Sequence, residues 1–158
     1  MKKYGILIGR FQPIHLAHQS IINEILHDGL TPLVFIGSCN KQNEKNPFSY
    51  IERVKMIHEI YGEQVVTLPL PDNPSDEAWS EYLLLLLNTI GVAKEECCLY
   101  FFRKNEELNI SGLLKDIEHK NPTYHEVYGL ISATEIRKNP INNKRYLDGR
   151  ILKYLIKG

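Results

Sequence analysis

The sequence predicts an α/β fold in which helices cover both faces of a five-stranded parallel sheet. Three observations lead to this fold class. Short apolar runs alternate with helix-like segments along the chain, glycines and prolines separate the two kinds of segment, and no internal repeat interrupts the pattern. Strands that are separated by helices need right-handed crossovers, which make the strands parallel and place helices on both sides.

The expected strands are apolar runs of suitable length, bounded by turn residues. The first is "YGILIG", which Arg10 follows, and the second is "PLVFIG". Runs of this kind are typical of strands that are buried on both faces. The predicted strands are residues 4–9, 32–37, 64–70, 97–102 and 123–127.

The expected helices lie between these strands. The first ends just before Gly29, a residue suited to the position after a helix. The second begins at Ser49, because Ser49 and Glu52 have the spacing of a capping box. The third stops near Gly91. The predicted helices are residues 18–27, from 49 onwards, 76–88 and 106–119, then a short helix from 132 and a last one from 144.

Composition indicates one domain, residues 1–158. The chain has 158 residues, 43% of them hydrophobic, and its 19 basic and 19 acidic side chains cancel. This balance argues against a nucleic-acid scaffold, which would carry a basic face. No apolar run is long enough for a signal peptide or a membrane span, so we expect a cytoplasmic protein. The three cysteines form no CxxC pair and indicate neither a disulfide framework nor a zinc site.

The loop after the first strand contains the densest cluster of chemically useful residues. In "GRFQPIHLAH" (9–18), Gly9 lets a ligand approach the backbone, and Arg10, His15 and His18 come together where a helix begins. A helix N-terminus attracts anions, so two imidazoles and a guanidinium there predict a polyphosphate cradle.

Two other interpretations of this loop remain open. One histidine could cap the helix while the other is a surface residue. The HxxH spacing could also indicate a metal pair, although zinc-binding histidines on one helix face are usually four residues apart. The loop lacks the GxxxxGK[ST] and GxGxxG patterns of other phosphate-binding loops.

A second polar cluster lies near the far end of the chain, in "LISATEIRKN" (130–139). Ser132 begins a helix, and Thr134 and Arg137 follow within its first turns. Hydroxyls and a guanidinium in this arrangement are suited to phosphate oxygens. Ser132 and Glu135 also have the spacing of a capping box, which needs no ligand.

These two motifs give the chain a resemblance to a known family. "GRFQPIHLAH" resembles the GRFQPxHxGH motif of nucleotidyltransferases, and "LISATEIRKN" resembles their ISSTxxR motif. The branch most similar to this chain is that of the nicotinamide-mononucleotide (NMN) adenylyltransferases, found alone in archaea or fused to a Nudix domain in bacteria. Ala17 departs from the pattern, because it stands where the family usually has glycine.

The resemblance implies a Rossmann-like nucleotidyltransferase fold and a set of ATP-binding residues. His15 and His18 would contact the ATP phosphates, and Arg10 and Arg137 would neutralise the triphosphate and the departing pyrophosphate. These four are the implied catalytic residues. The full implied ATP-binding set is Gly9, Arg10, Phe11, Gln12, His15, His18, Ser132, Thr134 and Arg137.

Two further segments resemble the part of the family that binds the nucleotide acceptor. "IGSCNKQNEKNPFSYIERVKMI" (36–57) implies Arg53 at the phosphate of NMN, with Ser38 nearby. "LPLPDNPSDEAW" (68–79) implies that Trp79 stacks on the nicotinamide ring, with Asp72 or Asn73 at its carboxamide or ribose. Arg53 could instead form a surface ion pair, and Trp79 could anchor its helix to the core.

The implied reaction is adenylyl transfer from ATP to NMN, which gives NAD and pyrophosphate. Mg2+ would bridge ATP oxygens, held mainly by substrate and water rather than by a protein metal site. The implied partners are the small-molecule substrates ATP and NMN, with neither nucleic acid nor membrane, in a homo-oligomer. The alternatives are adenylyl or cytidylyl transfer to phosphopantetheine or flavin mononucleotide (FMN), and a non-catalytic nucleotide-sensing domain.

Overall fold

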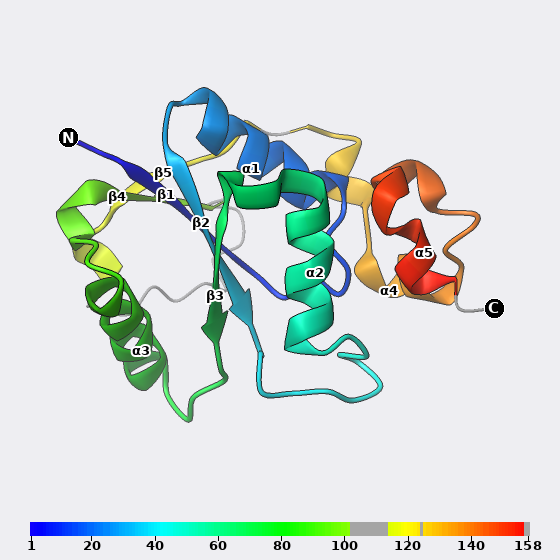
Figure 1. Ribbon diagram of the computed structural model, residues 1–158, viewed down its shortest axis with the longest axis horizontal. Coiled ribbons are helices and arrows are strands. Elements are labelled where there is room, and N and C mark those ends of the chain that lie inside the picture. Colours follow the sequence, from blue (N-terminus) through cyan, green and yellow to red (C-terminus); the bar gives the residue numbers. More distant parts are fainter. Residues whose placement is uncertain (102–113, 124, 157–158) are drawn as a thin grey trace.

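The computed structural model describes residues 1–101, 114–123 and 125–156. The strands in these residues form a single parallel sheet in the order β3-β2-β1-β4-β5 (Figure 1). The predicted fold class is therefore confirmed. The strands are β1 (Tyr4–Gly9), β2 (Thr31–Gly37), β3 (Val66–Leu70), β4 (Cys97–Tyr100) and β5 (Glu118–Lys120).

The helices lie in the connections between the strands and at the end of the chain. Their bounds are α1 (Leu16–His27), α2 (Tyr50–Tyr61), α3 (Asp76–Thr89), α4 (Ala133–Lys138) and α5 (Leu152–Leu155). Short 3-10 turns join them at Gly62–Gln64, Lys94–Glu96, Leu114–Asp116, Tyr128–Leu130, Lys144–Tyr146 and Gly149–Ile151.

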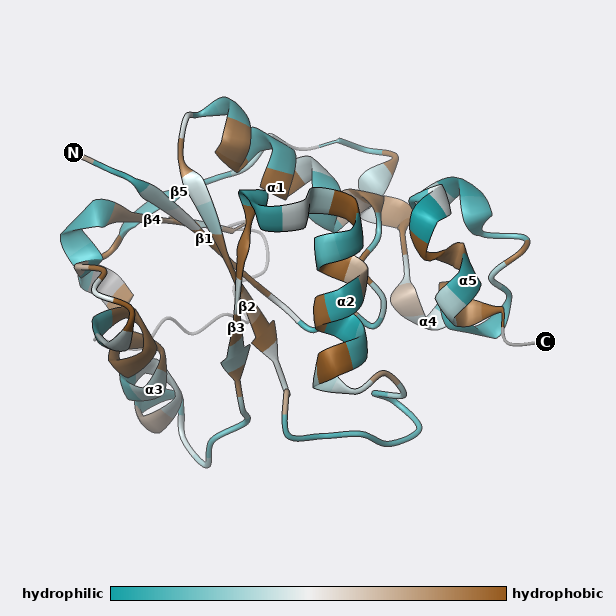
Figure 2. Cartoon of the chain, viewed as in Figure 1, coloured by the Kyte–Doolittle hydropathy of each residue, from teal (hydrophilic) through white to brown (hydrophobic). Residues whose placement is uncertain are grey.

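Two hydrophobic cores lie on opposite faces of the sheet. Successive residues of a strand point to opposite faces, so Leu7 packs in the core under α1, α2 and α4, and Ile6 packs in the core under α3. Helix α3 contributes Leu83 and Leu87, one turn apart, to the second core. Figure 2 shows the sheet as mainly hydrophobic between helices whose outer sides are hydrophilic.

The helix ends follow the local signals in the sequence. Ser49 caps α2, because its Oγ accepts from the Glu52 backbone N–H while the Glu52 carboxylate accepts from the Ser49 N–H. Gly29 and Gly91 follow α1 and α3 with φ of 79° and 75°, a conformation that L side chains rarely adopt. These predictions are confirmed.

The fifth predicted strand is wrong. The described residues of 123–127 contain no strand, and β5 lies upstream, where it overlaps the end of the predicted helix 106–119. The sequence of β5 is Glu-His-Lys, which lacks the apolar run that marks a buried strand. Among the described residues it pairs with β4 alone and forms an edge of the sheet. Residues 106–113 of the predicted helix lie outside the described residues.

The last predicted helix, from residue 144, is replaced by two 3-10 turns and the short α5. Asp148 interrupts it, because its carboxylate accepts the Arg150 backbone N–H as a local cap. Within the described part of the chain, no helix has the length and apolar character needed to cross a membrane.

Candidate functional site: a cavity at the carboxyl end of β1

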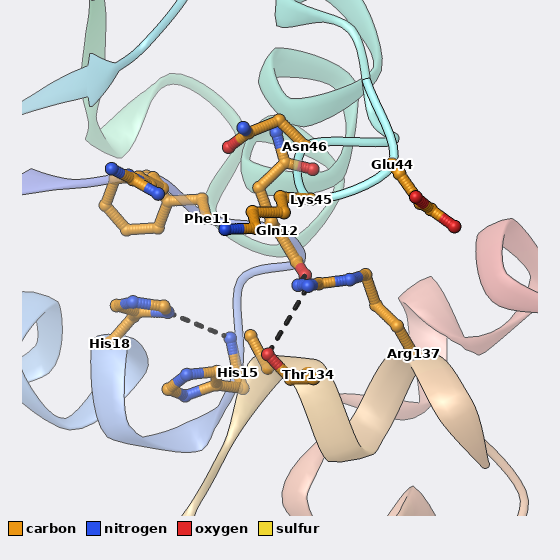
Figure 3. A pocket seen from close by; sticks show the side chains of 11 residues that line it. Phe11, Gln12, His15, His18, Glu44, Lys45, Asn46, Thr134 and Arg137 are labelled. Atoms are coloured by element: carbon orange, nitrogen blue, oxygen red, sulfur yellow. Dashed lines mark hydrogen bonds between the residues drawn. The ribbon is translucent and has the colours of Figure 1, made fainter. Parts of the chain in front are cut away.

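A cavity of about 570 Å³ opens beyond the carboxyl end of β1, the central strand of the sheet. The chain runs from β1 to β2 on one side of the sheet and from β4 to β5 on the other. In folds of this type, ligands bind at the carboxyl ends of the strands where the direction reverses. Three segments far apart in the sequence meet here (Figure 3). The lining residues are Arg10, Phe11, Gln12, His15, His18, Glu44, Lys45, Asn46, Ala133, Thr134 and Arg137.

The two histidines of the first loop lie one above the other. Their rings stack with centroids 3.9 Å apart and an interplanar angle of 24°. The backbone N–H of His15 donates to Nδ1 of His18 at 3.2 Å (Figure 3). Because Nδ1 of His18 accepts this bond, the proton of the neutral ring lies on Nε2.

Burial keeps both imidazoles neutral. Desolvation lowers the pKa of His15 to about 4. Desolvation also lowers the pKa of His18 well below its ordinary value, and the positive charge that His15 would carry lowers it further. Nδ1 of His15 is buried and has no hydrogen-bond partner among the described residues. The site therefore contains an unsatisfied polar atom of the kind that a bound ligand satisfies.

Phe11 fills the space beside Gly9. A Cβ on residue 9 would lie 3.0 Å from Cζ of the Phe11 ring. The glycine thus makes room for this ring, which also packs against His18 with centroids 4.5 Å apart. This differs from the expectation that a ligand occupies the space beside Gly9, and Gly9 does not line the cavity.

Gln12 connects the first loop to the loop before α2. Its Nε2 donates to the Phe48 carbonyl at 3.0 Å, and its Oε1 accepts from the Phe48 N–H at 2.9 Å. Both ends of the side-chain amide are therefore occupied. Gln12 lines the cavity, and its amide fixes the position of the backbone there; its expected contact with ATP stays a prediction.

The second motif joins the same cavity through α4. Nη1 of Arg137 donates to the Gln12 carbonyl at 2.6 Å, and Nη2 lies 3.5 Å from the Thr134 hydroxyl (Figure 3). Ser132 caps α4 by accepting the Glu135 N–H, and it does not line the cavity. Thr134 and Arg137 are therefore placed as expected, while Ser132 has the capping role that the sequence also allowed.

Glu44, Lys45 and Asn46 line the cavity although the sequence interpretation did not select them. Asn46 is buried, its Nδ2 donates to Asn43, and its Oδ1 has no partner among the described residues. The available signal was a lysine beside an asparagine directly before "PF", in a loop that follows a buried strand.

The residues expected to bind the acceptor lie outside this cavity. Ser38 donates to Asp72 at 2.8 Å, which joins the ends of β2 and β3. Asn73 donates to the Pro71 carbonyl at 3.0 Å. Trp79 is half-buried on α3 and packs against the second core, the position that the core-anchor interpretation gave it.

Arg53 differs most from its expectation. Its side chain is completely buried, and its guanidinium donates to backbone carbonyls instead of facing the cavity. An arginine in this environment cannot reach a surface ion pair, so the surface alternative is wrong.

Ala17 needs no glycine-like conformation. It lies in the first turn of α1 and is not among the described residues with positive φ. Alanine is the strongest helix former, so the departure from the motif is compatible with the local structure.

The described residues contain no group of three or more His, Cys, Asp or Glu side chains that could hold a metal ion. Among the residues that line the cavity, Glu44 is the one carboxylate. Cys97 and Cys98 are buried free thiols in β4, and burial raises the pKa of both.

The parallel sheet and the cavity at its carboxyl edge define a Rossmann-like α/β protein. Residues 6–139 match the cytidylyltransferase-like family, and the chain belongs to this family. Within it, the chain is similar to a nicotinamide-nucleotide adenylyltransferase of Methanolobus tindarius, with 41% identity over 141 residues, which is 87% of this chain and 76% of that protein.

A second relative with the same activity in its name comes from Methanococcus aeolicus. It is 30% identical over 147 residues, which cover 89% of this chain and 78% of that protein. The resemblance to NMN adenylyltransferases that the motifs indicated is thereby confirmed.

Solved structures show the same fold. A bifunctional NMN adenylyltransferase/ADP ribose pyrophosphatase from Francisella tularensis superposes with a TM-score of 0.82 at 24% identity, covering 98% of this chain and 49% of that chain. This chain therefore spans about half the length of that protein. A second structure of such a bifunctional protein, complexed with AMP and a manganese ion, has a TM-score of 0.76 at 25% identity.

Proposed function

We propose that the chain transfers the adenylyl group of ATP to nicotinamide mononucleotide, which gives NAD and pyrophosphate. The observation that carries this proposal is the convergence of two neutral histidines, two arginines and a lysine on one cavity at the carboxyl edge of the sheet. The names of relatives that match most of the chain support the same activity.

The nucleophile is a phosphate oxygen of NMN, which is already ionised at neutral pH, so the reaction needs no general base. A bond forms between this oxygen and the α-phosphorus of ATP, and the bond from the α-phosphorus to the bridging oxygen of the β-phosphate breaks. Pyrophosphate leaves with the electron pair. Catalysis then depends on alignment and on stabilisation of the developing charge.

His15 and His18 act as neutral hydrogen-bond donors to the ATP phosphates in this proposal. The His15 backbone leaves the proton of His18 on Nε2, the only nitrogen of that ring that is free to donate. Donors that are fixed before the reaction stabilise negative charge without having to reorganise.

Arg10, Lys45 and Arg137 supply the positive charge. Arg10 and Lys45 are exposed side chains at the cavity, and Arg137 is held by the Gln12 carbonyl. The guanidiniums are suited to two phosphate oxygens at once, and the lysine acts as a point charge.

The lining residues fit Mg2+ that is held by phosphate oxygens and water, because Glu44 is the one carboxylate at the cavity. Glu44 would hold the ion through water. When bound, Mg2+ neutralises part of the triphosphate charge. Ser38, Asp72, Asn73 and Trp79 would form the acceptor side, at the ends of β2 and β3 and the start of α3.

The test is pyrophosphate release with ATP and Mg2+, with the acceptor varied. NMN, its nicotinic-acid analogue, phosphopantetheine and FMN are offered in parallel. We expect release with a pyridine nucleotide and none with the other two acceptors. Release with phosphopantetheine or FMN alone would refute the assigned acceptor, and ATP binding without any release would indicate a nucleotide sensor.

A further inference from the structure

Arg53 of α2 is a completely buried cation surrounded by backbone carbonyls. Nη1 donates to the carbonyl of Arg10 at 2.9 Å and to that of Gly37 at 2.8 Å. Nη2 donates to the Ser38 carbonyl at 3.3 Å, and Nε donates to the Ser49 carbonyl at 3.2 Å. One side chain thus joins the loop after β1, the end of β2 and the cap of α2.

No carboxylate compensates this charge within the described residues, because the ion pairs found there do not include Arg53. Desolvation lowers its pKa, and the neighbouring ionisable groups Cys39 and Tyr50 have smaller opposite effects. A buried charge without a counter-ion is costly unless it is fully hydrogen-bonded. The four carbonyls therefore offset the cost of burying Arg53.

Two of the four carbonyls that Arg53 binds, those of Arg10 and Gly37, lie where the ladder between β1 and β2 ends, whereas those of Ser38 and Ser49 also accept backbone N–H groups. Gly37 is the last residue of β2, and Arg10 directly follows β1, so their carbonyls lie beyond the ladder between these strands. A buried carbonyl that is left unpaired destabilises the fold. Arg53 satisfies these groups together, much as a capping side chain satisfies the end of a helix.

The same contacts fix the backbone from which the cavity is built. The Arg10 carbonyl is one residue before Phe11, whose φ of 53° is unusual for a non-glycine residue. Ser38, with φ of 50°, is the corresponding residue after β2. Such conformations persist only where the surroundings hold them. The guanidinium lies against both segments.

We propose that Arg53 is a positioning residue for the adenylyl transfer inferred above: it holds the ends of β1 and β2 so that Arg10 meets the triphosphate, and it does not touch the acceptor. This inference rests on the proposed function. It replaces the expected contact between Arg53 and the phosphate of NMN with an effect on the ATP side of the site.

Lysine cannot reproduce this role. A guanidinium is planar and presents five donors in a fixed fork, whereas an ammonium is a compact point charge on a flexible stem. Arg53→Lys keeps the positive charge but loses the simultaneous contacts with β1, β2 and the α2 cap. At a direct phosphate contact, in contrast, lysine would keep the charge attraction to the phosphate.

The experiment measures the affinity of MgATP for the folded protein without acceptor, by calorimetry. It compares wild type, Arg53→Lys and Arg53→Gln with Lys55→Met, which removes an exposed cation from the same helix. Folding is checked by circular dichroism at the temperature of the titration. We expect Arg53→Lys to weaken MgATP binding about tenfold or more, because a small misplacement of binding groups has large effects. Lys55→Met should leave the MgATP affinity unchanged.

Two outcomes would overturn the proposal. Unchanged MgATP affinity with a raised KM for NMN would make Arg53 an acceptor ligand. Unchanged affinity with only a lower unfolding temperature would make its role purely structural. If wild type binds MgATP but releases no pyrophosphate, the proposed function fails while the comparison of MgATP affinities remains valid.

Wild-type protein provides a second readout that does not depend on the folding of a variant. The Nε–H resonance of Arg53 is followed by NMR while NMN or inorganic phosphate is added. We expect it to stay in place, because the guanidinium is committed to carbonyls. A large shift upon addition of NMN would show direct contact and contradict the proposal.

Discussion

His15 holds His18 in one tautomer, because the backbone N–H of His15 donates to Nδ1 of His18 at 3.2 Å. The two imidazole rings stack with their centroids 3.9 Å apart. The hydrogen bond leaves Nε2 of His18 as the donor. His18→Ala should lower kcat about 10²-fold or more, in the range measured for the loss of one charge-stabilising donor. Steady-state kinetics test this, with His27→Ala, an exposed histidine at the other end of α1, as the control. A His18→Ala variant within threefold of wild type would remove His18 from the mechanism.

The depressed pKa of His15 makes stability depend on pH in a defined direction. The ordinary pKa of 6.5 applies to the unfolded chain, and burial lowers it to about 4 in the folded protein. Below pH 6.5 the unfolded chain therefore binds a proton that the folded protein does not, and stability falls until about pH 4, by at most about 1.4 kcal/mol per pH unit. Urea unfolding at several pH values should show that the free energy of unfolding falls less for His15→Gln than for wild type as the pH is lowered. The same pH dependence of this free energy in both proteins would contradict the lowered pKa of His15.

The two hydrogen bonds between the Gln12 side chain and the Phe48 backbone predict that a one-atom change of this side chain destabilises the protein. Gln12→Glu keeps an acceptor for the Phe48 N–H but turns a second oxygen towards the Phe48 carbonyl. We expect the free energy of unfolding to fall by about 1–3 kcal/mol. Gln42→Glu is the matched control, because Gln42 is exposed and donates to Pro47 at 3.2 Å. Equal effects of the two changes would show that the bridge contributes little.

Mutation of Trp79 should affect the binding of NMN but not that of ATP. In our account its indole faces the nicotinamide ring, whose positive charge it stabilises by about 0.5–2 kcal/mol. Trp79→Ala should raise KM for NMN about 2- to 30-fold and leave KM for ATP unchanged, while Trp79→Phe keeps most of the effect. If Trp79→Ala lowers only the unfolding temperature, the side chain belongs to the core alone.

Removal of divalent cations should stop turnover without destabilising the protein. Chelation removes the ion that neutralises ATP, and added Mg2+ should restore activity. Because the described residues contain no three-ligand metal group, the unfolding temperature without nucleotide should stay the same. A chelator-induced fall in that temperature would reveal a metal held by the protein itself.

The parts of the structure that could be predicted depend on local signals. Ser49 and Glu52 mark the start of α2, and the buried runs of β1 and β2 are apolar throughout. β5 could not be found in this way, because an edge strand of three polar residues takes its conformation from pairing with β4. The conformation of such a strand is determined by tertiary contacts rather than by its own sequence.

The site was predictable in its residue types but less so in its contacts. The pattern placed His15, His18 and Arg137 around one cavity, yet it could not show that the amide of Gln12 is occupied by Phe48. It also could not show that the guanidinium of Arg53 is buried. Both results depend on contacts between segments that are far apart in the sequence, and spacing along the chain does not report such contacts.

Adenylyl transfer to NMN is tested most directly by measuring NAD and pyrophosphate together after the protein is mixed with ATP, Mg2+ and NMN. We expect both products to appear in equal amounts. Pyrophosphate without NAD, or neither product from a protein that still binds ATP, would contradict adenylyl transfer to this acceptor.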